Sequence, residues 1–278
     1  MPFYSPLRYP GGKRRLTPLI VRILMQNNLR DIHYVEPFAG GGAIALALLF
    51  NDFASTIHVN DLSRPVYSFW HSMVNNADEL CHRIVSTEIN MTEWYRQKEI
   101  YNQRKTADLL DLGFATFYLN RTNRSGIIGG GVLGGKDQQG KWKLDARFNK
   151  NDLVERILKI KRHSERISVS NEDAIELLKK HNRNPINNAF YFIDPPYIAR
   201  GRNLYFNNYE TRDHLELQRH VLKLRAPWAV TYDYDGVRKE ALFKDQRKLE
   251  FELSYSAQKK EKGKEILIVG DDVALVGD

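Results

Sequence analysis

The feature that most constrains the fold of this chain is an apolar run that ends in a polar tetrapeptide. Residues 189–193 read AFYFI, and Asp194, Pro195, Pro196 and Tyr197 follow directly. A short apolar run bounded by prolines predicts a buried strand. The tetrapeptide then stands at the carboxyl end of that strand, where open α/β sheets bind their ligands.

The tetrapeptide offers hydrogen-bond acceptors on a stiff backbone. Asp194 precedes a proline and is held in extended geometry, and neither proline has an N–H to donate. The Asp194 carboxylate and the Pro195 carbonyl can both accept from one planar amino group, while the Tyr197 ring can stack on a flat heterocycle. Such a pocket suits an extruded nucleobase with an exocyclic amine. For this motif alone, a plain strand end that turns at the prolines is the alternative.

Length and composition limit the class of protein. A chain of 278 residues can bury a substantial core and predicts one domain with a large insertion, or two domains. No apolar stretch reaches membrane-spanning length, and residues 1–6 lack the features of a signal peptide, so we expect a cytoplasmic protein without a membrane partner. Cys81, the only cysteine, permits no internal disulfide and no zinc spacing, and we expect it to pack as a small hydrophobic residue.

The net positive charge is concentrated in one segment. The formal net charge of the whole chain is +8, and residues 120–166 hold twelve basic residues against five acidic ones. A surplus of this kind predicts a polyanionic partner, nucleic acid before a membrane surface, because no apolar lipid-binding face accompanies it. A solvated helix face over residues 152–166 is the alternative for part of the charge.

A strand, a glycine turn and a helix follow one another near the N-terminus. Residues 32–35 predict the strand, Gly40 to Gly42 the turn and residues 43–49 the helix, which is how nucleotide-binding α/β folds begin. A second strand at 56–59 leads to Asp61, where an acidic side chain typically accepts from ribose hydroxyls. The third glycine of the dinucleotide motif is missing, so adenosine without a pyrophosphate fits better than NAD. An ordinary loop is the alternative.

Residues 6–13, PLRYPGGK, predict a loop ahead of an amphipathic helix that ends near Asn27. The glycines beside Lys13 let the backbone approach an anionic group. Because the Walker spacing is absent and Arg14 stands where that motif has Ser or Thr, ATP hydrolysis is disfavoured.

The long segment between the second strand and the next sheet strand, at 166–170, changes character halfway. Its first half predicts helices, for instance at 66–75 and 93–104, and residues 110–120 continue as an apolar stretch. The sequence NRTNRSG at 120–126 then leads into a tract where seven of the eighteen glycines fall between 126 and 140. We predict a mobile hairpin or loop whose arginines read guanine and whose other basic residues meet phosphates. A flexible loop with solvated lysines is the alternative.

The remaining elements complete an α/β pattern. Asp173 can cap a helix that starts at Ala174. Residues 213–224 predict an amphipathic helix and 228–232 a strand, and residues 249–255 and 265–269 predict an antiparallel hairpin at the sheet edge.

Four motifs in this order resemble those of Dam-like adenine-specific DNA methyltransferases: PLRYPGGK at 6–13, EPFAGGG at 36–42, Asp61, and DPPY at 194–197. The resemblance implies a Rossmann-like S-adenosylmethionine-dependent methyltransferase sheet with an antiparallel C-terminal hairpin, and an inserted, mostly helical target-recognition domain. It predicts a catalytic domain over 1–61 and 167–278 and a target-recognition domain over 62–166.

The resemblance also implies that a methyl group passes from S-adenosyl-L-methionine to the N6 amine of a flipped adenine in double-stranded DNA. Tyr9 stands where the family frequently has tryptophan, and NRTNRSG looks like the entrance of the recognition hairpin. The glycine tract departs from GATC-specific members, so no recognition sequence is implied. The implied catalytic residues are Asp194, Pro195, Pro196 and Tyr197. The implied cofactor-binding residues are Tyr9, Lys13, Phe38, Gly40, Gly42, Asp61, Asp173 and Asp194. The predicted DNA-binding residues are Asn120, Arg121, Arg124, Lys136, Lys141, Lys143 and Arg147.

In this chemistry, hydrogen bonds from the amine to Asp194 and to the Pro195 carbonyl favour a pyramidal nitrogen, whose lone pair can attack a methyl group. We expect no metal and no covalent cysteine route. Two alternatives stay open. One is a methyltransferase for RNA or protein glutamine, whose pockets more often begin with Asn than with Asp. The other is a non-catalytic DNA-binding relative. The oligomeric state defaults to a monomer, in a phage or restriction-modification setting.

Overall fold

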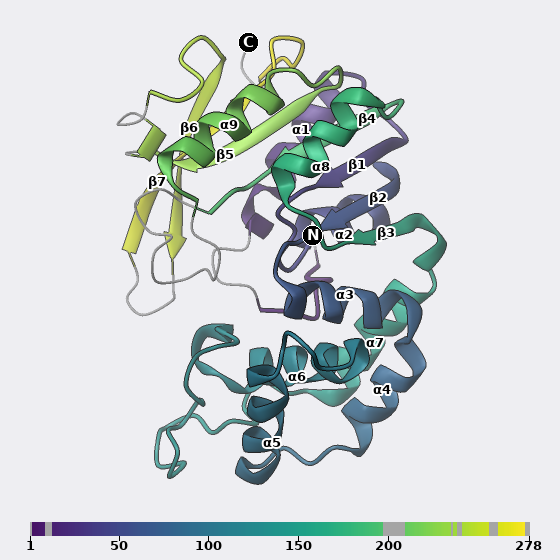
Figure 1. Ribbon diagram of the computed structural model, residues 1–278, viewed down its shortest axis with the longest axis vertical. Coiled ribbons are helices and arrows are strands. Elements are labelled where there is room, and N and C mark those ends of the chain that lie inside the picture. The colour runs from purple at the N-terminus through teal and green to yellow at the C-terminus, as the bar shows by residue number, and fades with distance from the viewer. Residues whose placement is uncertain are drawn as a thin grey trace. The chain divides into compact units, whose positions relative to one another are not determined.

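A seven-stranded sheet in the order β3-β2-β1-β4-β5-β7-β6 forms the frame of the fold (Figure 1). The structure is a computed structural model that describes residues 2–8, 13–196, 209–234, 236–237, 241–255 and 261–275. β1 runs parallel to β2 and β4, and β4 parallel to β5, whereas β7 is antiparallel to β5 and β6. The predicted α/β class and the antiparallel C-terminal hairpin are confirmed. The strands are β1 Ile32–Glu36, β2 Ala54–Asn60, β3 Ile167–Ser170, β4 Ala189–Ile193, β5 Trp228–Asp233, β6 Lys248–Tyr255 and β7 Glu261–Val269.

The described residues divide into two units. The sheet unit comprises residues 2–3, 13–62 and the described part of 170–275, and the helical unit comprises residues 4–8 and 63–169. Residues 4–8, which the sequence analysis places with the first domain, group with the helical unit. No described helix is long and apolar enough to cross a membrane.

Helices cover both faces of the sheet. The residues of β4 are all buried, and Tyr191 and Ile193 pack with α8 and α9 while Phe190, on the other face, stacks on Tyr34. Figure 1 shows α8 and α9 in front of the sheet and α1 and α2 behind it. This two-sided burial explains the uninterrupted apolar run of β4. The elements are η1 Lys13–Leu16, α1 Thr17–Gln26, α2 Ala43–Phe50, α8 Ala174–Arg183 and α9 Thr211–Val221.

The helical unit is organised around α6, which is buried from residue 112 to its end. Gly113 allows α6 to approach α3, because a Cβ at this position would lie 2.6 Å from the Ser68 carbonyl oxygen. Helices form at both predicted places, 66–75 and 93–104, and the apolar stretch at 110–120 lies in α6. Two more, α4 and α7, complete the unit, and α4 buries Cys81 as expected. The helices are α3 Arg64–Asn75, α4 Ala77–Ser86, α5 Met91–Asn102, α6 Leu109–Thr122 and α7 Lys150–Lys161.

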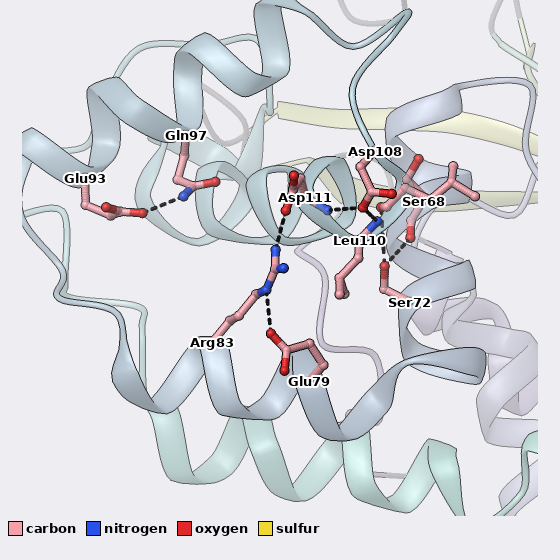
Figure 2. A network of polar contacts seen from close by, with 10 residues as sticks. Ser68, Ser72, Glu79, Arg83, Glu93, Gln97, Asp108, Leu110 and Asp111 are labelled. Carbon is pink, nitrogen blue, oxygen red and sulfur yellow. Dashed lines mark hydrogen bonds and ion pairs between the residues drawn. The ribbon is translucent and has the colours of Figure 1, made fainter.

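Polar contacts fix the start of α6 (Figure 2). The Asp108 carboxylate caps the helix by accepting from the amides of Leu110 and Asp111, at 2.8 and 3.2 Å. Arg83 of α4 donates to Asp111 at 2.6 Å and to Glu79 at 3.0 Å, which joins α4 to the same turn. The cap stabilises the first turn of α6, and the bridge fastens that turn to α4.

Candidate active site

Polar side chains gather at the carboxyl ends of β1, β4 and β5. Strand connections run outward in opposite directions from the neighbouring strands β1 and β4, which makes this the switch point of the sheet. Because side chains alternate along a strand, Glu36 points to the same face as Tyr34, and Asp194 to the same face as Phe192. Thr231 of β5 and Glu265 of β7 complete the group.

Asp194 is held through one of its two carboxylate oxygens. Its Oδ1 accepts from the Thr231 hydroxyl at 2.7 Å and lies 3.2 Å from Lys13 Nζ. Lys13, 5% exposed, also lies 3.5 Å from Glu265, whose side chain is 1% exposed. Among the described residues no hydrogen bond reaches Asp194 Oδ2, and the side chain is 20% exposed. The second oxygen is therefore available to accept from a ligand.

A second carboxyl group lies beside this pair. Glu36 is buried at the end of β1. Burial, together with the negative charge of Asp194, holds the pKa of Glu36 well above its usual range. The neutral form of Glu36 is thereby favoured, which limits the negative charge that gathers around Asp194.

The glycine turn after β1 is fixed to the ends of the neighbouring strands. Gly40 and Gly42 adopt φ angles of 48° and 54°, in the left-handed region that glycine tolerates best. The Gly40 amide donates to Asp61 Oδ2 at 2.8 Å. Asn60, wholly buried, donates to the carbonyls of Pro37 and Glu172 at 2.9 and 3.0 Å. The turn and Asp61 thus form one polar rim on the sheet.

Asp173 has the geometry of a helix cap. Its Oδ1 accepts from the amides of Ile175 and Glu176 at 2.9 and 3.2 Å. Its Oδ2 lies 3.5 Å from the Tyr209 hydroxyl, and the Tyr209 ring packs edge-on against Phe38 at 5.7 Å. The cap is therefore present, and the predicted cofactor contact of Asp173 stays a prediction beside it.

The predicted DNA-binding residues of the helical unit differ in exposure. Arg124, Lys136, Lys141 and Lys143 are exposed, and Arg147 is half-buried. Asn120 and Arg121 are buried at the end of α6. The roles of these seven residues in DNA binding stay predictions. The cofactor-binding role of Tyr9 and the catalytic role of Tyr197 also stay predictions, because both residues lie outside the described part of the chain.

The two buried residues hold the N-terminal segment. Asn120 accepts from the Arg8 amide at 2.8 Å and donates to the Arg8 carbonyl at 3.1 Å and to the Gly126 carbonyl at 2.7 Å. Arg121 donates to the carbonyl of Pro6. The buried part of NRTNRSG thus positions residues 6–8.

The glycine tract forms a folded loop rather than a regular hairpin. Among residues 123–149, all of which are described, strand pairing is limited to one antiparallel bridge between Asn123 and Val132. The Asn123 side chain donates to the carbonyls of Ile127 and Ile128 at 3.1 and 2.9 Å. Gln138 donates to the Leu133 carbonyl at 2.8 Å and accepts from the Leu144 amide at 3.0 Å. Side-chain amides replace the backbone ladder of a hairpin here.

Residues 9–260 match the D12 class N6 adenine-specific DNA methyltransferases. The chain belongs to this family. A type II methyltransferase of Lactococcus lactis subsp. cremoris, M1.LlaDCHI, is 23% identical over 214 residues, which cover 73% of this chain and 68% of that protein.

Two solved methyltransferase structures also overlap this chain. The rRNA methyltransferase aviRa of Streptomyces viridochromogenes is 12% identical, with a TM-score of 0.42 over 94% of this chain and 85% of that one. A SAM-dependent methyltransferase of Agrobacterium tumefaciens is 11% identical, with a TM-score of 0.38 over 90% of this chain and 61% of that one. At these scores the assignment rests on the family match.

Thr231, Glu265 and Asn60 belong to this site although no sequence pattern singled them out. Thr231 is the one threonine or serine in the run WAVTYD, and Glu265 precedes the apolar run ILIV. A polar residue within a buried strand is a signal, because its hydrogen bonds must be met by other protein groups. The spacing in the sequence does not connect Thr231 with Asp194 or Glu265 with Lys13, because the partners come from distant parts of the chain.

Proposed function

We propose that this methyltransferase transfers a methyl group from S-adenosyl-L-methionine to the N6 amine of an adenine flipped out of duplex DNA, within a specific sequence. The family match supports the adenine chemistry. One observation carries the proposal: Asp194 is fixed through Oδ1 and has Oδ2 available at the carboxyl end of β4. An acceptor fixed in place fits the recognition of an exocyclic amine.

The residues around the glycine turn fit S-adenosylmethionine. Asp61, held by the Gly40 amide, can accept from the two ribose hydroxyls. Phe38 and Tyr209 offer an aromatic pair for a flat ring, and Asp173 Oδ2 beside them can accept from an amine. Bound S-adenosylmethionine supplies an electrophilic methyl group.

The chain itself orients the nucleophile. Asp194 Oδ2 accepts one hydrogen of the adenine amine and the Pro195 carbonyl accepts the other, so that the nitrogen becomes pyramidal and its lone pair is less delocalised into the ring. Thr231 and Lys13 keep Oδ1 in place. Both are buried, which limits the reorganisation needed when the amine arrives.

We further infer that the sheet unit carries the catalysis and that the helical unit recognises DNA. The exposed basic residues Arg124, Lys136, Lys141 and Lys143 support this division, since exposed cations on a loop suit contacts to phosphates and bases. Asp194 in place of the asparagine more frequent in glutamine and RNA pockets favours adenine in DNA.

The direct test is incubation of the full chain with radiolabelled S-adenosylmethionine and duplex DNA, RNA or protein. Label is expected in DNA, as N6-methyladenine after digestion to nucleosides. Asp194→Ala should abolish the transfer and leave cofactor binding largely intact, while Asp245→Ala, a change of an exposed carboxylate, should leave both unchanged. Label found in RNA or protein alone, or near-normal turnover by Asp194→Ala, refutes the proposal.

A further inference from the structure

Four arginines of the helical unit lie near one another, and one of them pairs with a carboxylate. Arg156 of α7 pairs with Asp152 at 2.9 Å and donates to the Ser5 carbonyl at 3.2 Å. Among the described residues, the side chains of Arg8, Arg121 and Arg147 form no ion pair with an acidic residue. The cluster therefore carries an excess of positive charge.

Two of these guanidinium groups have buried N–H groups without a partner. Arg121 is 7% exposed, and its contact with the Pro6 carbonyl leaves its Nε without a hydrogen-bond partner in the described structure. Arg147 Nη1 is also buried, and no acceptor among the described residues reaches it. Buried cationic donors without an acceptor are unfavourable, and an anion from outside the chain would satisfy them.

The guanidinium groups lie close enough to influence one another. Burial, followed by the charges of Arg156 and Arg8, lowers the pKa of Arg121 to about 9. Burial and the charge of Arg147 lower the pKa of Arg8. The arginine charges that contribute to both shifts indicate that these guanidinium groups lie within electrostatic range of one another.

The backbone around Arg8 is fixed in advance. Asn120 holds both the amide and the carbonyl of Arg8. Gly126, at φ 77°, lies against the Arg8 carbonyl oxygen so closely that a side chain at 126 would collide with it. A binding site that is built before its ligand arrives loses less conformational entropy on binding.

A structural clamp explains only part of this arrangement. The carbonyls of Ser5 and Pro6 account for donors of Arg156 and Arg121, and Asp152 accounts for the remaining contacts of Arg156. They do not account for Arg121 Nε or for the side chain of Arg147. These are the donors that an additional ligand would meet.

We propose that Arg8, Arg121 and Arg147 form a binding site for one phosphate group of the DNA backbone. The inference rests on the proposed function, which makes duplex DNA the substrate. Guanidinium groups bind phosphate through paired N–H donors, and such contacts fix the register of a protein on the duplex without reading its sequence. The site would thereby position the loop that begins at Arg124.

The test is a scan of a short duplex in which single phosphates are replaced by neutral methylphosphonates. At one phosphate of the duplex, the methylphosphonate is expected to weaken binding of the wild-type protein but not of Arg147→Gln. We call this phosphate the coupled position. The slope of log affinity against log salt should fall by about 0.9 in Arg147→Gln, the value for one phosphate contact. Arg22→Gln, a change of an exposed arginine on α1, serves as the matched control and should retain the wild-type pattern.

Circular dichroism verifies that the variants fold. Arg8→Gln is the second variant, because Asn120 holds the backbone of Arg8 rather than its side chain. The methylphosphonate at the coupled position is expected to have no effect on binding by this variant either. Identical scans and slopes for wild type and both variants overturn the site. Stabilisation of the wild type by inorganic phosphate, without a coupled position in the duplex, means that a free anion fills the site and overturns the assignment to DNA.

Label transfer measured on the same preparations separates this inference from the proposed function. Transfer to DNA without a coupled position refutes the phosphate site alone. A coupled position without transfer supports the site and refutes methyl transfer.

Discussion

Replacement of Thr231 by valine tests whether the position of Asp194 determines the rate. Thr231 is wholly buried, and its hydroxyl donates to Asp194 Oδ1 at 2.7 Å. Valine keeps the shape of the side chain and removes this donor. A hydrogen bond to a charged group contributes about 1.5–3 kcal/mol. If that energy is needed to orient the carboxylate in the transition state, kcat falls about ten- to hundredfold.

The assay is single-turnover transfer of labelled methyl groups to duplex DNA, with cofactor affinity measured by calorimetry. Thr231→Val should lower the rate and leave cofactor affinity within about twofold, since Thr231 acts on Asp194 and not on the cofactor turn. Thr231→Ser restores the hydroxyl and should recover most of the rate. Recovery of this kind separates a positioning role from a loss of packing.

The matched control is Thr116→Val in α6, another wholly buried threonine, whose hydroxyl has no hydrogen-bond partner within the described chain. It should keep the wild-type rate. Wild-type turnover by Thr231→Val, in protein that is fully folded at the assay temperature, would refute the reasoning.

Three further predictions concern the sheet unit. Asp61→Ala should weaken S-adenosylmethionine binding by about 1–3 kcal/mol in calorimetry, because charge-assisted hydrogen bonds are lost. Asp61→Asn is the control, because it keeps an acceptor for the Gly40 amide. Unchanged affinity in the alanine variant would mean that Asp61 has a structural role only. Glu36→Gln should raise Tm more at pH 8 than at pH 5. The reason is that the pKa of Glu36 is raised in the folded chain, so the wild type loses stability as pH rises above about 4.3. Equal changes in Tm at the two pH values would contradict this. Burial and the charge of His181 lower the pKa of His58 to about 4, so the free energy of unfolding should fall by about 1.4 kcal/mol per pH unit as pH drops from about 6.5 towards 4. In His58→Gln, urea unfolding should show a shallower fall with pH. An identical fall in the variant would exclude His58 as the cause.

Local sequence patterns were sufficient for the parts of the fold that depend on neighbouring residues. The strand before Asp194 and the glycine turn after β1 both follow from apolar runs next to residues with special backbone preferences. The edge hairpin of β6 and β7 follows from two strand patterns across a short lysine-rich connection. In each case the partner residues are close in sequence or the pattern alone decides the element.

The contacts around Asp194 could not be predicted in this way. Lys13 and Glu265 meet across the sheet although most of the chain separates them, and no spacing rule connects the two. The contacts that fold the glycine tract could not be predicted either. Glycine content indicates turns but not their partners, and the amides of Asn123 and Gln138 fold the tract without a paired hairpin. Long-range polar contacts of this kind depend on the assembled fold.

The hydrogen bonds of Asn60 and Asn171 have a consequence for how such chains diversify. Asn171 donates to the carbonyls of Asp61 and Leu62 at 2.7 and 3.0 Å, so the points where the chain leaves and rejoins the sheet unit are fastened to each other. With both ends closed by the sheet unit itself, the length of the connection between them contributes little to the stability of that unit. Residues 63–166, which precede β3, thus occupy a position where the chain can change in length or sequence without rebuilding the sheet.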